Sequence, residues 1–137
     1  MAEEIEEIRR RKLEELRNRD DDAESEGAAA QRPTEPVAVD GTAALTETVS
    51  RGDVVLVDFY ADWCGPCQML EPVVETIAAE TEATVAKVDV DANQGLAAEY
   101  GVRGVPTLIV FADGEPVERL VGMQDEARLR SVIEEHV

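Results

Sequence analysis

Cysteine and histidine are scarce in this sequence of 137 residues. It contains two cysteines, Cys64 and Cys67, and one histidine, His136, close to the C-terminal end. A structural zinc site almost always takes four nitrogen or sulfur ligands, so zinc would require two chains to share one site. The two thiols are separated only by Gly65 and Pro66. They could also form a small structural disulfide, or act as a dithiol that is oxidised and reduced.

Long apolar runs are also missing. The first residues, MAEEIEEIRRRKLEEL, contain no apolar stretch that could serve as a signal peptide. No segment approaches the roughly 18 apolar residues that a membrane-spanning helix needs. We therefore expect a cytoplasmic protein that does not enter a membrane. Because thiols are kept reduced in the cytosol, a permanent structural disulfide would be unusual there.

Lysine is rare, whereas acidic residues are abundant. The chain has 31 Asp and Glu against 13 Lys and Arg, a net charge of −18, and its only lysines are Lys12 and Lys87. This charge opposes nucleic-acid binding by the domain, and in dilute buffer it strains a compact fold through self-repulsion. At about 1 M salt the Debye length is about 3 Å, so the repulsion largely disappears. The composition is typical of a halophilic microbe, but an ordinary acidic protein is the alternative.

The chain divides into an N-terminal arm, a linker and one larger domain. Residues 1–19 have the pattern of a helix, with apolar residues on one face and pairs such as Glu7 with Arg11 four positions apart. With so few apolar residues, this arm could fray freely or could dock on a partner. Residues 20–36 are acidic, rich in alanine and closed by prolines, which predicts a flexible linker. The domain comprises residues 37–137.

The domain alternates strand patterns with helix patterns. Apolar runs predict strands at 36–39, 54–61 and 83–90, and residues 106–122 predict a hairpin with its turn at Asp113-Gly114. Helices are expected at 41–52, 64–80 and 93–101, and near the C-terminus, where Leu129, Val132 and Ile133 share one face. This order predicts an α/β fold with a central mixed sheet of about five strands and helices on both faces.

The position of the two cysteines favours redox chemistry. Cys64 lies where a buried strand ends and a helix begins, and there the unpaired backbone N–H groups and the helix dipole favour a thiolate. Since the thiolate is the attacking species in thiol–disulfide exchange, this placement activates Cys64. Cys67, one turn into the helix, can reach back and resolve a mixed disulfide. Gly65 would permit a tight backbone, and Pro66 occupies the first turn, where its missing N–H is not needed.

The segment WCGPC after VDFYAD resembles the thioredoxin family, and the resemblance continues through KVDVDAN, YGVRGVPTLIVFADG and LVGM. It covers residues 37–137 and leaves the first 36 residues outside. It implies the thioredoxin fold and a general protein-disulfide reductase whose redox group is the Cys64–Cys67 pair itself, with no cofactor. Its partners would be oxidised cytosolic proteins and a thioredoxin reductase, and we expect a monomer.

The resemblance implies a role for each matching residue near the thiols. Cys64 would be the nucleophile and Cys67 the resolving thiol. Asp58, a charged residue inside an apolar strand, would help to move the proton of Cys67, and Lys87 would pair with Asp58 across adjacent strands. As an alternative, Asp58 could be a strand-end aspartate that is hydrogen-bonded to its neighbours.

Other matching positions would form the substrate groove. Pro106 matches a cis proline that packs against the active disulfide, and Val105 would offer backbone groups to an extended substrate. Trp63 and Gly122 match residues beside this groove, where an exposed apolar rim would bind partner proteins. Taken alone, Trp63 could be ordinary packing.

Two positions depart from the family pattern, and a competing hypothesis concerns the whole chain. Tyr60 stands where many members carry tryptophan, and Gln68 follows the second cysteine where lysine is common, which puts the redox potential and partner preference in doubt. The competing hypothesis is a thioredoxin-fold binding or scaffold subunit whose N-terminal arm mediates the partner contact. The intact pair of thiols argues against it, because a pure scaffold needs none.

Overall fold

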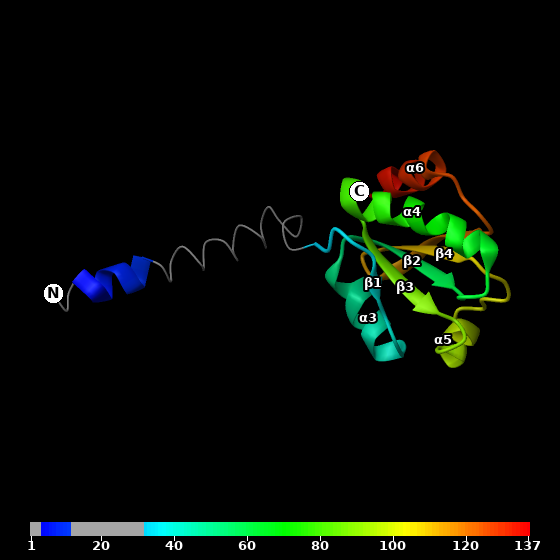
Figure 1. Ribbon diagram of the computed structural model, residues 1–137, viewed down its shortest axis with the longest axis horizontal. Helices are drawn as coiled ribbons and strands as arrows, with labels where there is room; N and C mark the ends of the chain where they lie inside the picture. The colour runs from blue at the N-terminus through cyan, green and yellow to red at the C-terminus, as the bar shows by residue number, and fades with distance from the viewer. Residues whose placement is uncertain (1–3, 12–31) are drawn as a thin grey trace. The chain divides into compact units, whose positions relative to one another are not determined.

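The computed structural model describes residues 4–11 and 32–137 (Figure 1). The chain separates into two compact units, Met1–Arg32 and Pro33–Val137. In the first unit, residues 4–11 are helical, and Arg11 and Glu7 form the predicted ion pair with 3.7 Å between Nη2 and Oε1. Ile5 and Ile8 are exposed on this helix. The predicted continuation of the helix to residue 19 and most of the predicted linker, residues 20–31, lie outside the described residues.

The second unit is built on a five-stranded mixed sheet. Its strands are β1 (Val37–Ala38), β2 (Val54–Tyr60), β3 (Thr84–Asp89), β4 (Thr107–Ala112) and β5 (Glu115–Val121). They lie in the order β1-β3-β2-β4-β5, with β3 parallel to both β1 and β2. β4 runs antiparallel to β2 and to β5. The predicted mixed α/β sheet is therefore confirmed.

Helices cover both faces of this sheet (Figure 1). They are α3 (Thr42–Arg51), α4 (Gly65–Glu80), α5 (Gln94–Glu99) and α6 (Glu126–His136). The core beneath α4 and α6 contains Leu70, Val74, Leu129 and Ile133, and the core beneath α3 and α5 contains Leu45, Val49, Phe59 and Leu96. None of the helices in the described part of the chain is long and apolar enough to cross a membrane.

The central strand β2 explains how a charged residue enters the core. Its residues from Val54 to Phe59 are all buried, as the near-continuous apolar run predicts. Side chains alternate between the two faces of a strand. Leu56 packs in the core beneath α4 and α6, whereas Val57 and Phe59 pack in the core beneath α3 and α5. The alternation therefore turns Asp58 towards the face that α4 covers.

The edges of the sheet and the final hairpin have distinct local structures. β4 and β5 are joined at Asp113-Gly114, where both residues have positive φ angles, 53° and 84°, as a two-residue hairpin turn requires. A register shift interrupts the pairing of β4 with β5 at Val110 and Phe111. The edge strand β5 includes Pro116, and the opposite edge, β1, is only two residues long.

The second unit begins close to the predicted start of the domain. The sequence assigned residues up to 36 to the linker, whereas the compact unit begins at Pro33. Residues 34–36 line a shallow groove together with Glu71, Glu75 and Ala79 of α4 and with Lys87 of β3. Residues 34–36 therefore lie beside α4 within the compact unit.

The charge of this unit should make its stability depend strongly on salt. From Val37 onward the chain has 19 acidic and 6 basic residues, hence a net charge of −13. We expect the melting temperature to rise with KCl up to about 1 M, because added salt screens this self-repulsion. Thermal unfolding followed by circular dichroism at increasing KCl would measure the effect. A melting temperature that does not change between dilute buffer and molar KCl would contradict the halophile interpretation.

Candidate active site

The two cysteines lie at the start of α4 and are joined by a disulfide. Their Cα atoms are 5.2 Å apart. Cys64 is the N-cap residue of α4, with φ −90° and ψ 112°, and Pro66 occupies the first turn as predicted. Both cysteines are nearly buried, with exposed fractions of 4% and 5%. Burial therefore does not distinguish one thiol from the other.

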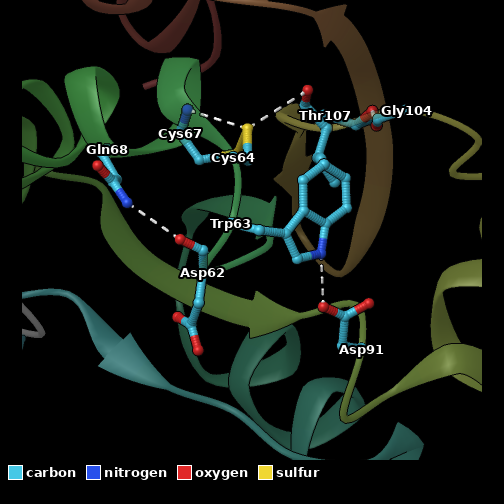
Figure 2. The surroundings of a disulfide bond; sticks show 9 residues. Asp62, Trp63, Cys64, Cys67, Gln68, Asp91, Gly104 and Thr107 are labelled. Atoms are coloured by element: carbon cyan, nitrogen blue, oxygen red, sulfur yellow. Dashed lines mark hydrogen bonds between the residues drawn. A yellow bond between two sulfur atoms is a disulfide. The ribbon is translucent and has the colours of Figure 1, made fainter.

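The helix N-terminus distinguishes them instead. The backbone N–H of Cys67 donates a hydrogen bond to Sγ of Cys64 over 3.1 Å (Figure 2). The side chain of Cys64 thus acts as the cap of its own helix. A negative charge on this sulfur is favoured both by that N–H and by the positive end of the helix dipole. The geometry favours a thiolate at Cys64 when the disulfide is reduced.

A second backbone segment lies beside the disulfide. The peptide bond between Val105 and Pro106 is cis, as predicted for Pro106. The carbonyl oxygen of Val105 is 3.7 Å from Sγ of Cys64. Gly122 donates its N–H to the carbonyl oxygen of Pro106 over 2.8 Å, with a φ of 89° that favours glycine. The fold thus brings Val105 close to Cys64 and joins Gly122 to the same backbone segment.

Trp63 lies on the surface beside the disulfide. Its side chain is 72% exposed, so ordinary core packing does not explain it. The indole N–H donates to Oδ2 of Asp91 over 2.8 Å, and the Gln68 amide donates to the carbonyl oxygen of Asp62 over 3.0 Å (Figure 2). The hydrogen bond to Asp91 fixes an exposed aromatic ring at the edge of the site.

The carboxyl group of Asp58 is buried on the face of the sheet that α4 covers. Asp58 is only 1% exposed, and its two carboxylate oxygens have no hydrogen-bond partner within the described residues. Desolvation by burial raises the pKa of Asp58 to about 7, an effect that Lys87 opposes and Glu71 reinforces. The alternative of an aspartate satisfied by its neighbours does not fit this environment.

The predicted direct pair between Lys87 and Asp58 is not formed. The two residues are opposite each other in the register of β2 and β3. The ammonium of Lys87, however, lies 2.9 Å from Oε1 of Glu71, and 4.3 Å from the centre of the Tyr60 ring. The long lysine side chain therefore reaches past its strand neighbour to a carboxylate on α4. Lys87 acts on Asp58 through its charge and not through a hydrogen bond.

The family model for thioredoxin matches residues 36–135 of this chain. The chain belongs to the thioredoxin family. A thioredoxin from Staphylococcus aureus is 51% identical over 86 residues, which is 61% of this chain and 83% of that protein. A thioredoxin structure from Halobacterium salinarum NRC-1, solved as a point mutant, has 64% identity and a TM-score of 0.75 and covers 77% of this chain and 93% of that one. The structure of Fasciola hepatica thioredoxin has 39% identity and a TM-score of 0.69, with 74% and 99% covered.

Family membership settles the question that the two cysteines raised. Thioredoxins are protein-disulfide reductases that act through an active-site cysteine pair, and the chain is a dithiol–disulfide oxidoreductase with Cys64 and Cys67 as that pair. The redox group of a thioredoxin is the disulfide of the protein itself, and family members are reduced by thioredoxin reductase. The scaffold hypothesis is not favoured. The halophile prediction agrees with the similarity to the Halobacterium protein.

The role of Gly65 in the thioredoxin motif stays a prediction, and two contacts near the site were missed. Gly65 does not have a left-handed backbone, and a Cβ added there would meet no atom within 4 Å beyond its chain neighbours and the backbone of its own helix. The contacts of Trp63 with Asp91 and of Lys87 with Glu71 were not predicted from the sequence. No local sequence pattern indicates either contact, because each joins residues from different elements.

Proposed function

We propose that Cys64 attacks the disulfides of oxidised proteins and that Cys67 resolves the mixed disulfide that follows. The observation that carries this assignment is the hydrogen bond from the Cys67 N–H to Sγ of Cys64 over 3.1 Å. It places a donor at the sulfur that must bear negative charge before it can attack. Cys67 lies inside the first turn, and its own N–H is already directed at Cys64.

The reaction transfers two electrons in two exchange steps. The Cys64 thiolate attacks one sulfur of the substrate disulfide, that S–S bond breaks, and the other substrate sulfur leaves as a thiolate that takes up a proton. Cys67 then loses its proton and attacks Sγ of Cys64 in the mixed disulfide. The second substrate thiolate leaves, and the Cys64–Cys67 disulfide forms. The substrate is thereby reduced to two thiols, and the cysteine pair is oxidised.

Asp58 is the proposed acceptor of the proton from Cys67. The alternation of β2 turns Asp58 towards α4, the helix that contains Cys67. A group is an efficient base when its pKa lies near the working pH, and the pKa of Asp58 is raised to about 7. The positive charge of Lys87 stabilises the ionised form of Asp58. Gly65 and Pro66 separate the two cysteines within the first turn of α4.

The substrate would bind along the surface formed by Trp63, Val105, Pro106 and Gly122. The carbonyl oxygen of Val105 lies beside Cys64 and would accept a hydrogen bond from an extended substrate backbone. The exposed ring of Trp63 offers an apolar contact at the edge of the site. A Cβ added at Gly65 would meet no atom within 4 Å beyond its chain neighbours and the backbone of its own helix, which leaves room for the approaching disulfide.

The proposed division of labour assigns catalysis to the thioredoxin domain, residues 37–137. All the site residues described above belong to the compact unit Pro33–Val137. The arm, residues 1–19, and the linker, residues 20–36, are not part of the proposed site. The full function is a monomeric reductase of oxidised proteins in the cytoplasm that is itself reduced by a thioredoxin reductase, without nucleic-acid or membrane partners.

Limited alkylation tests which thiol is the nucleophile. When the reduced full-length protein meets less than one equivalent of iodoacetamide at pH 7, we expect the adduct almost entirely on Cys64, because the alkylating agent reacts with the thiolate. Both cysteines lie between Arg51 and Lys87 in a single tryptic peptide, so peptide fragmentation must locate the adduct.

The same reaction in concentrated urea is the control, because unfolding removes the helix terminus and should make the two thiols equally reactive. Equal modification of Cys64 and Cys67 in the folded protein would contradict the proposed roles.

A further inference from the structure

Glu71 forms an ion pair with Lys87 on the face of the sheet that α4 covers. It follows Cys67 by four residues, so it lies one turn further along the same side of the helix. Its carboxylate holds the Lys87 ammonium at 2.9 Å. Lys87 is the cation whose strand position is directly opposite Asp58. The ion pair therefore determines where the positive charge nearest Asp58 is located.

We propose that Glu71 is a positioning residue that holds the Lys87 ammonium away from Asp58 and thereby sets the pH range in which Asp58 accepts a proton. This inference rests on the proposed role of Asp58 in the resolving step. It adds a third charged residue to that role, one that acts through Lys87 and touches neither the thiols nor the substrate.

Few other charged or titratable groups near Asp58 could change the pH range in which it accepts a proton. On β3 the facing charge is Lys87, on α4 it is Glu71, and on β2 the neighbour on the same face is Tyr60, whose ring also contacts Lys87. β4 places Leu108 opposite Asp58, and α6 contributes Leu129, Val132 and Ile133 to this core. The charged Arg130 of α6 is paired with Glu80 and Glu126. Glu35 and Glu75 line the groove further out. The Cys64–Cys67 disulfide does not titrate.

Exposure explains why the ion pair with Glu71 can persist. Lys87 is 16% exposed and Glu71 is 51% exposed, so the pair lies at the rim where water solvates the carboxylate. Asp58 is buried and its carboxylate has no hydrogen-bond donor within the described residues. A lysine released from Glu71 has a four-carbon side chain that can rotate towards the deeper carboxylate. Both the lost negative charge and the approach of the ammonium would favour ionised Asp58.

Titration of Asp58 in the oxidised full-length protein provides the test. In the disulfide form the thiols do not ionise, so the ¹³C signal of the Asp58 carboxyl carbon reports this group alone, and its absence in Asp58→Asn assigns it. We expect the Glu71→Gln variant to lower the titration midpoint by about one pH unit, since an opposite charge brought close lowers a carboxyl pKa by about 1–3 units.

Two matched variants make the test specific. Glu75→Gln removes the same charge from the same groove and one turn away, and we expect it to leave the midpoint nearly unchanged. In a Lys87→Gln background, Glu71→Gln should move the midpoint much less than it does in the native chain, because the inference requires Glu71 to act through Lys87. An unchanged midpoint in Glu71→Gln, or equal shifts with and without Lys87, would overturn the inference.

The pH dependence of activity separates this inference from the proposed function. In single-turnover reduction of a small disulfide protein, we expect Glu71→Gln to move the pH of half-maximal rate of the resolving step downward, as its titration does. Asp58→Asn should remove that inflection. If the inflection remains in Asp58→Asn, the proposed role of Asp58 is wrong. If Asp58→Asn removes it but Glu71→Gln does not move it, only the inference about Glu71 fails.

Discussion

The Cys67→Ser variant should accumulate covalent complexes with oxidised substrate proteins, whereas the Cys64→Ser variant should form almost none. With Cys67 replaced, the Cys64 thiolate still receives the N–H of residue 67 and can attack, but no thiol remains to break the mixed disulfide. With Cys64 replaced, the remaining thiol lacks both the N-cap position and a donated N–H, so little of it ionises at neutral pH. The two variants differ although the two thiols are equally buried.

Non-reducing gel electrophoresis of each variant after incubation with oxidised cytosolic protein would measure the trapped complexes. A lane treated with excess dithiol is the control, because it should release every complex. Equal trapping by both variants would refute the assigned roles. The absence of trapping by either variant would revive the scaffold hypothesis, in which the thiols have no redox partner.

Asp58→Asn should stabilise the oxidised protein in alkaline solution and have little effect in acid. The pKa of Asp58 rises from 3.8 to about 7 in the folded state. Between these values the native protein binds more protons than the unfolded chain, so its stability falls as the pH rises from about 4 to 7 and stays lower above that. A shift of about three units corresponds to roughly 4 kcal/mol, and a neutral amide of the same shape removes this penalty.

The observed gain should be smaller than this limit, because the asparagine amide is itself polar and buried. Urea unfolding of the oxidised protein at pH 8.5 and at pH 4 would measure it, with a midpoint shift on the order of 1 M expected at the higher pH and a much smaller one at the lower. Asp53→Asn, the same change at an exposed position, is the control and should follow the native chain at both pH values. If Asp58→Asn behaves like Asp53→Asn, Asp58 does not titrate near pH 7.

The features that could be predicted from the sequence are those determined by neighbouring residues. The apolar run of β2 predicts a strand buried on both faces, and Asp113-Gly114 predicts the final turn, because each depends on backbone preferences within a few positions. The placement of Cys64 at a helix start and of Pro66 in the first turn is of the same kind. The WCGPC segment with its accompanying motifs was sufficient for the family.

The features that were missed depend on how elements distant in the sequence pack together. Strand register predicts that Lys87 lies opposite Asp58, but the choice of Glu71 as its partner depends on where α4 crosses β3. The hydrogen bond of Trp63 to Asp91 joins residues 28 positions apart. No local pattern specifies these contacts, since long side chains select their partners only after the helices have packed on the sheet.

The two edges of the sheet limit aggregation at the high salt concentrations to which the acidic composition is suited. At molar salt the charge no longer keeps neighbouring molecules apart, because repulsion is screened beyond about 3 Å. An open strand edge could then pair with the edge of another molecule and begin aggregation. Here one edge, β1, offers only two residues for pairing, and the other, β5, contains Pro116, which has no N–H to donate. This resistance to edge-to-edge association comes from the backbone, so concentrated salt does not weaken it.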